Sequence, residues 1–217
     1  MGILSRLFGS KTSFIDRVWT TAERKLDDVV DRVGRDIAAG TPSILVYHFE
    51  ATGEALEERL RGANVLFENI RTPSTQVLHA LDTAAGPSTV PLVSSTEIPA
   101  SLPPQNRPGA PVSVHLAEHF PTPSRDDHVV GLAAILPPKS TFTAYVALDE
   151  GWVRDVIGSS VTDIMKQLGM DEDECVTHAS IASALRRAQE KLAARVRSPE
   201  QPARSSDEWM TFNLKPS

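Results

Sequence analysis

An unbroken apolar stretch at residues 43–49 constrains the fold of this chain more than any other sequence feature. A strand with one face in water alternates apolar and polar residues, so an unbroken run indicates a strand buried on both faces, as in a parallel sheet. Gly40 and Pro42 end a helical pattern just before this run, and another helical pattern follows at residues 54–61. A buried strand between helices predicts an α/β domain, because the helices cover both faces of the sheet.

Apolar segments and helical patterns continue to alternate along the chain. The predicted strands are 43–49, 64–68, 89–93, 112–116 and 142–148, and the predicted helices are 13–39, 54–61, 74–85, 124–136, 151–157, 159–168 and 179–197. We expect Ser13 and Ser124 to cap the helices that they begin. Pro91 lacks a backbone donor, so its strand is expected at a sheet edge or at a bulge. The predicted fold is a mainly parallel sheet with flanking helices and a C-terminal helical extension.

The two ends of the chain differ in composition from the middle, which is expected to form one domain over residues 13–198. Residues 1–12 are expected to be an amphipathic or disordered tail, in which Leu7, Phe8 and Arg6 suit weak contact with an anionic membrane surface. Residues 199–217 are expected to be a flexible linker that ends in an apolar tail at 209–214. That tail either packs back onto the domain or serves as a partner-binding peptide.

Composition argues against several classes of function. The net charge is −6, whereas a nucleic-acid-binding face needs clustered Lys and Arg, so no nucleic-acid partner is expected. Cys175 is the only cysteine, and the six histidines show no zinc-ligand spacing, so neither an intrachain disulfide nor a metal is expected. No apolar run approaches the roughly 20 residues of a membrane span, and residues 1–9 lack the features of a signal peptide. The expected location is the cytoplasm, with peripheral attachment at the inner face of the membrane left open.

Several short motifs occur in an order that resembles one protein family. Leu168, Gly169 and Met170 are followed by an acidic turn with Glu174 and His178. Further matching segments are 16–25, 40–46, 117–127, 145–150 and 184–191. This ordered set covers about residues 14–197 and resembles the second nucleotide-binding domain of SecA, the ATPase that drives bacterial preprotein export. The resemblance implies a RecA-like fold of the P-loop NTPase type, the second of two such domains in a helicase-type motor.

The resemblance is weakest where a motor of this kind holds phosphate. Such motors bind ATP between two domains, with a Gly-rich P-loop from the first and charge-neutralising arginines from the second. The chain has no P-loop pattern, and residues 128–137, where the family has its arginine run, are mostly apolar. Residues 94–99 keep only a trace of the family's loop after the third strand. The resemblance therefore implies a degenerate domain that does not hydrolyse ATP alone and has no catalytic residue of its own.

Four residues are candidates for binding a nucleotide, because they stand where the resembling family contacts it. They are Thr96, Glu97, Arg125 and Asp127. For the last two, the alternative is an ordinary helix N-terminus, where acidic side chains complement the helix dipole.

Histidines near strand ends form a second group of candidates. His48, His115 and His119 lie where open α/β sheets bind ligands, so they either surround a small ligand or metal or make structural hydrogen bonds. Glu118 and His119, together with the aspartates at positions 126 and 127, would suit general acid/base catalysis. No nucleophile is evident beside them.

These observations favour a non-catalytic, SecA-like accessory or binding module with a protein partner in translocation or in a motor. Two alternatives remain open: half of a split ATPase that a separate P-loop chain completes, and an interaction scaffold unrelated to export. No cofactor is required for the favoured function, and binding of ATP or ADP is left open.

Overall fold

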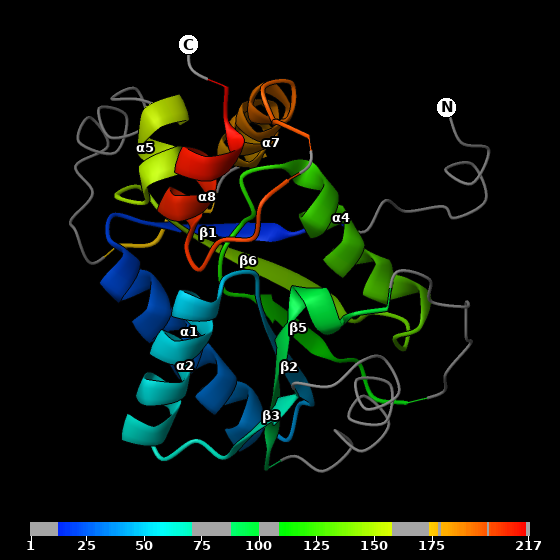
Figure 1. Ribbon diagram of the computed structural model, residues 1–217. Coiled ribbons are helices and arrows are strands. Elements are labelled where there is room, and N and C mark those ends of the chain that lie inside the picture. Colours follow the sequence, from blue (N-terminus) through cyan, green and yellow to red (C-terminus); the bar gives the residue numbers. More distant parts are fainter. Residues whose placement is uncertain are drawn as a thin grey trace.

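A sheet of six parallel strands lies at the centre of the described structure (Figure 1). The computed structural model describes residues 13–70, 88–99, 109–157, 174–177, 179–198 and 200–215. The strands are β1 (Ile15–Trp19), β2 (Ser43–Tyr47), β3 (Phe67–Ile70), β4 (Val90–Ser94), β5 (Ser113–Leu116) and β6 (Thr141–Ala147). Their order is β1-β6-β5-β2-β4-β3, and every neighbouring pair is parallel. The apolar run that predicted a buried strand forms β2, which pairs with β4 on one side and β5 on the other.

Helices cover both faces of this sheet, which confirms the predicted α/β class. α1 (Ala22–Ala38) and α2 (Glu50–Gly62) pack on one face, and α4 (Pro123–Val130) with the 3₁₀ helix η3 (Gly131–Ala134) packs on the other (Figure 1). The remaining described helices are η2 (Ser95–Glu97), α5 (Gly151–Ile157), α7 (Ala179–Ala193) and α8 (Ser206–Asn213). The predicted helices at 74–85 and 159–168 lie outside the described residues. The layered arrangement is consistent with a RecA-like fold. Within the described ranges, no helix has the length and apolarity that crossing a bilayer requires.

The prediction of a single helix over residues 13–39 is wrong at its start. Residues 15–19 form β1, which pairs with β6 at the edge of the sheet, and α1 begins only at Ala22. Thr21 is the N-cap in place of Ser13, and its hydroxyl accepts a hydrogen bond from the Arg24 N–H at 3.3 Å. The helical pattern of this stretch belongs to α1 alone. Val18, which the pattern included, is buried from the strand instead.

The placement of Pro91 at a sheet edge is also wrong, because β4 lies between β2 and β3. The Val90 N–H donates to the Leu66 carbonyl beside β3 at 3.0 Å, so the next residue along the strand, Pro91, faces β2. Pairing between β2 and β4 begins only at Leu92. Pro91, which has no N–H to donate, therefore stands just before the β2–β4 ladder starts, where its missing N–H breaks no hydrogen bond.

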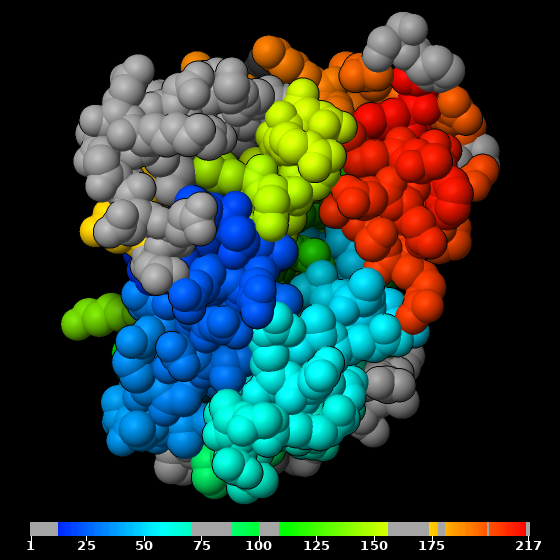
Figure 2. All heavy atoms as spheres, turned by 90° about the vertical axis from the view of Figure 1, so that its left-hand side faces the viewer, coloured from blue at the N-terminus to red at the C-terminus, as the bar shows by residue number. Residues whose placement is uncertain are grey.

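The C-terminal apolar tail packs back onto the domain, which is one of the two alternatives for it. Residues 206–213 form α8, and the hydroxyl of Ser205 caps it by accepting from the Glu208 N–H at 3.2 Å. Trp209 is 1% exposed and packs with Phe49 and Phe120. The space-filling view shows α8 in red against α5 and close to α2 (Figure 2).

The segment that leads into α8 is tied to α2, where a flexible linker was expected. The Ala51 N–H, in the first turn of α2, donates to the Arg204 carbonyl at 3.0 Å. The Arg204 guanidinium contacts Glu50 at 2.9 Å and Glu54 at 2.8 Å on the same helix. We refer to residues 200–214, the segment and α8 together, as the C-terminal strap.

Candidate functional site

Polar side chains collect at the carboxyl edge of the sheet, directly after three of its strands. His48 follows β2, Ser95 follows β4, and Glu118 and His119 follow β5. The chain moves from β2 toward β3 and β4 on one side and returns to β5 and β6 on the other. The ends of β2 and β5 therefore form the topological switch point, where open α/β sheets bind their ligands.

Asp126, near the start of α4, is the centre of a buried hydrogen-bond network at this edge. α4 begins at Pro123, after Thr122 rather than after the predicted cap Ser124. One oxygen of Asp126 lies 2.8 Å from His48 Nε2 and accepts from the Phe120 N–H at 3.0 Å. The other lies 2.6 Å from His119 Nδ1 and accepts from Gln189 Nε2 at 2.6 Å. Asp126 therefore joins β2, β5, α4 and α7 in one network.

His119 lies between two carboxylates, since its other ring nitrogen is 3.2 Å from Asp16 Oδ1 on β1. Burial alone would lower the pKa of His119, but the charge and hydrogen bond of Asp126, followed by those of Asp16, raise it to about 10. Burial alone would likewise raise the pKa of Asp126, but the charge of His119 and its hydrogen bonds hold it well below the usual range. At neutral pH the pair is an imidazolium and a carboxylate.

Ser95, His48 and Asp126 are the residue types of a hydrolytic triad, but they are buried where a substrate would not reach them. His48 Nδ1 is 2.8 Å from Ser95 Oγ, and His48 Nε2 faces Asp126. Ser95 is 3% exposed and His48 6% exposed, and neither lines the pocket described below. A nucleophile must reach the substrate atom that it attacks, so this arrangement holds β2, β4 and α4 together and is not suited to catalysis.

Glu118 holds the start of α2 rather than acting beside His119. Its carboxylate accepts from the N–H groups of His48 at 3.2 Å and Phe49 at 3.0 Å, and from the Thr52 hydroxyl at 2.7 Å. Phe49, the N-cap of α2, has no capping side-chain bond of its own. All these contacts lie at the helix N-terminus, so they favour a structural role for Glu118 over acid/base chemistry with His119, which stays an untested hypothesis.

The crevice at the switch point is filled by aromatic side chains. Phe49 follows β2 and Phe120 follows β5, and their rings stack with centroids 5.1 Å apart. Trp209 of the C-terminal strap meets Phe120 edge-on at 5.2 Å and donates its Nε1–H to Glu200 at 2.8 Å. The place where this fold class receives ligands is thus occupied by the chain itself.

A separate pocket opens on the α4 face of the sheet. It has a volume of about 460 Å³ and lies between the start of β1, α4 and α7. Asp16, His119 and Gln189 contribute polar groups to its lining, and Phe14 and Leu185 contribute apolar ones. This is a volume typical of small-molecule sites.

Three of the four sequence candidates for nucleotide binding, Thr96, Arg125 and Asp127, contact other described residues. Thr96 is exposed on η2, with its hydroxyl 2.8 Å from Ser94 Oγ, and Glu97 is half-buried beside it. Arg125 lies over the Phe120 ring at 4.7 Å. Nucleotide binding by Thr96 and Glu97 stays a prediction.

Arg125 and Asp127 are held by neighbouring elements. Arg125 contacts Glu200 of the strap at 3.4 Å, and Asp127 accepts two bonds from Arg186 of α7 at 2.7 and 2.9 Å. These contacts favour the alternative in which both side chains serve the start of α4. A nucleotide contact by either residue stays a prediction.

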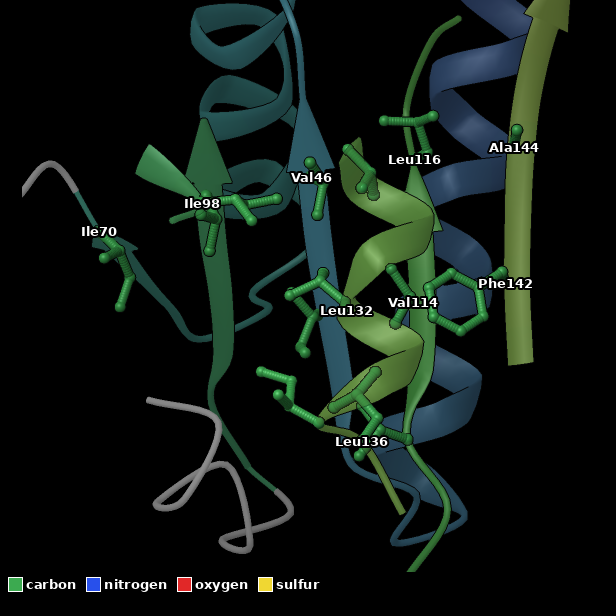
Figure 3. Close-up of a cluster of buried hydrophobic side chains, with 14 residues drawn as sticks. Val46, Ile70, Ile98, Val114, Leu116, Leu132, Leu136, Phe142 and Ala144 are labelled. Atoms are coloured by element: carbon green, nitrogen blue, oxygen red, sulfur yellow. The ribbon is translucent and has the colours of Figure 1, made fainter. Parts of the chain in front are cut away.

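Residues 128–137, where the resembling family has arginines, direct four apolar side chains into the core. Val129, Leu132, Ile135 and Leu136 are buried. Figure 3 shows Leu132 and Leu136 of this segment against side chains of the central strands, Val114 among them. No guanidinium from this segment reaches the carboxyl edge of the sheet.

The three histidines do not surround one ligand, as one hypothesis suggested. His115 lies on the α1 face, with Nδ1 2.9 Å from the Tyr145 hydroxyl and Nε2 2.8 Å from Asp36 Oδ2. Burial alone would raise the pKa of Asp36, but the His115 contact outweighs it and lowers that pKa. His48 and His119 share Asp126 on the other face. The described residues include no group of three or more His, Cys, Asp or Glu side chains that could hold a metal ion.

Comparisons with known proteins give similar solved structures but no family, and two of those structures are described below. No protein-family model and no curated protein matches the chain. One similar structure is the C-terminal part of the Fun30 ATPase domain, at 12% identity and a TM-score of 0.45, with 77% of this chain and 54% of that chain covered. The chain thus spans about half the length of that structure.

The second similar structure is the C-terminal domain of a protein described as a possible DNA helicase from Lactobacillus plantarum WCFS1. It has 17% identity and a TM-score of 0.36, with 64% of this chain and 74% of that chain covered. Both structures are C-terminal parts of ATPase or helicase proteins, and neither description names SecA. Likenesses at these scores do not say what this chain does.

Proposed function

We propose that this chain is a non-catalytic accessory module on a RecA-like fold, which acts by binding a protein partner associated with an ATPase. The observation that carries the proposal is the closed switch-point crevice. Phe49, Phe120 and Trp209 fill the space above β2 and β5, and the Arg204 carbonyl takes the Ala51 N–H at the start of α2. That N–H lies at a helix N-terminus, where a phosphate would otherwise be received.

The charges around this edge support the same proposal. Phosphoryl transfer needs cationic groups directed at the γ-phosphoryl. The segment that would supply them packs Val129 and Leu132 into the core, and Arg125 and Arg186 are engaged by Glu200 and Asp127. A nucleotide at this edge would have to displace the strap and break these ion pairs. A role in protein export rests on the resemblance to SecA alone.

The first experiment measures phosphate release from Mg-ATP by the purified full chain, beside a Thr96→Ala variant. The expected result is no turnover above a blank for either protein. Turnover by the wild type that the Thr96→Ala change abolishes would contradict the proposal. The link to export is tested separately, by adding the chain to purified SecA and measuring the ATP turnover of SecA. A concentration-dependent change supports the link, and an unchanged rate at saturating chain removes it.

A further inference from the structure

The pocket between β1, α4 and α7 has charges that select one class of ligand. Its lining holds three carboxylates, those of Asp16, Asp126 and Asp127, against one imidazolium, His119, and one guanidinium, Arg186. An anion such as phosphate would face more negative than positive groups there. The lining therefore favours a cation.

The carboxylates differ in what they can still bind. Asp126 already accepts from four groups, and Asp127 is paired with Arg186 through both oxygens. The Asp16 side chain is 8% exposed, and its one hydrogen bond to a described residue is a long one, from Oδ1 to His119 Nε2 at 3.2 Å. Oδ2 of Asp16 makes no bond to any described residue. Because Asp16 lines the pocket, this oxygen is an acceptor available to a ligand there.

The lining of the pocket does not suit a metal ion, because the described residues offer no group of three ligands. A metal ion needs several ligands, and the imidazolium of His119 stands beside the Asp16 carboxylate and opposes a metal cation there. Phe14, Val130 and Leu185 give the rest of the pocket an apolar wall. An apolar wall beside a single acceptor fits a cationic head on a hydrocarbon stem.

We infer that this pocket binds an organic cation, an alkylammonium or alkylguanidinium group. Asp16 is its counter-ion, and its hydrocarbon part packs against Phe14 and Leu185. Two sources have this chemistry: a free amine, and a Lys or Arg side chain of a partner protein. The site lies on the α4 face, apart from the closed crevice, so the inference does not depend on the proposed function.

The test is a titration of the full chain followed by amide chemical shifts, with n-butylammonium and n-butylguanidinium as probes and butyrate as the anionic control. The expected result is saturable shifts around Asp16 and Leu185 with both cations and none with butyrate. Asp16→Asn is expected to weaken binding by tenfold or more. Asp31→Asn, an exposed carboxylate on α1, is the matched control and is expected to leave binding unchanged.

A second variant keeps the test decisive if Asp16→Asn unfolds. Ala182→Lys leaves Asp16 unmutated and places a tethered ammonium at the pocket wall, where it competes with the probe. It is expected to abolish binding of both cations. An acetylated Gly-Arg-Gly amide is compared with butylguanidinium. Tighter binding of the peptide assigns the site to a partner side chain, and tighter binding of the free cation assigns it to a small molecule. The inference is overturned if no cation saturates the shifts, if butyrate binds equally well, or if both variants bind like the wild type.

Discussion

Replacement of Trp209 by Ala tests how firmly the C-terminal strap closes the switch-point crevice. The indole is 1% exposed, meets the Phe120 ring at 5.2 Å and donates to Glu200 at 2.8 Å. Truncation of a buried Trp to Ala costs about 3–5 kcal/mol of unfolding free energy. Because the strap is held by its contacts to α2 and to Phe49 and Phe120, the protein can also release it and lose only its docking energy. We therefore expect a loss near the lower end, about 3 kcal/mol.

The matched control is Phe212→Ala, an aromatic truncation in the same helix. Phe212 is 40% exposed, so we expect a loss of under about 1 kcal/mol. Both variants are unfolded in urea and followed by far-ultraviolet circular dichroism, which does not depend on the indole that is removed. Equal urea midpoints for the two variants would refute the reasoning, since they would mean that Trp209 contributes no more than a surface aromatic.

Amide hydrogen exchange locates the effect of the Trp209 change. The Ala51 N–H donates to the Arg204 carbonyl of the strap at 3.0 Å, whereas the Val65 N–H donates to the Leu60 carbonyl at 2.9 Å, with no part in the strap. Release of the strap should speed exchange at Ala51 and leave Val65 unchanged. Faster exchange at both amides would instead indicate general destabilisation.

Three further predictions concern the network and the helices. The pKa of His119 is about 10 in the folded protein and 6.5 in the unfolded chain. The stabilisation by its proton is therefore complete below pH 6.5 and is lost as the pH rises from there to about 10. Urea unfolding across that range should show a loss of up to about 5 kcal/mol, and a flat profile, or one that His119→Gln leaves unchanged, would contradict it. Glu118→Gln removes a charged acceptor from three donors at the start of α2. We expect it to lower the unfolding free energy by about 2 kcal/mol in the same assay. An unchanged unfolding free energy would mean that the contacts are incidental. The new Cβ of Gly34→Ala, on α1, meets nothing within 4 Å, so this variant should raise the unfolding free energy by up to about 1 kcal/mol. The new Cβ of Gly53→Ala lies 2.7 Å from a tyrosine ring of β2, so this variant should lower it by about 1–3 kcal/mol. Equal midpoints for the two glycine variants would count against the packing at α2.

The central strands could be predicted from sequence because burial on both faces is recorded in their local composition. β2 is the clearest case, and its flanking helices follow from ordinary periodicity. β1 was missed because it is an edge strand, with Ile15 58% exposed and Val18 buried, and because the periodicity of α1 begins right after it. Edge strands present a mixed pattern that a neighbouring helix pattern readily absorbs.

The candidate site could be predicted only in part. His48 and His119 were marked by their places at strand ends, and Asp126 was seen only as part of a helix start. The contacts that make the network join residues 78 positions apart for His48 and Asp126, and 103 apart for His119 and Asp16. Pairings of that length depend on the order of strands in the sheet, which no local pattern reports.

Some members of the network stand in segments that the sequence analysis named, but their part in the network could not be predicted. Gln189 belongs to the motif that resembles SecA, yet its bonds to Phe120 and Asp126 follow from how α7 lies against α4. Ser95 stands in an ordinary polar turn after β4. A buried polar residue is conspicuous only once its burial is known, because in sequence it looks like any surface residue.

The central claim, that the chain closes its own ligand crevice, is tested most directly by calorimetric titration of the full chain with Mg-ATP and with ADP. The account predicts no saturable heat for either nucleotide, or binding no tighter than about 1 mM. Micromolar binding of ATP that Trp209→Ala leaves unchanged would contradict it, because it would show that the strap does not occupy the site that the nucleotide uses.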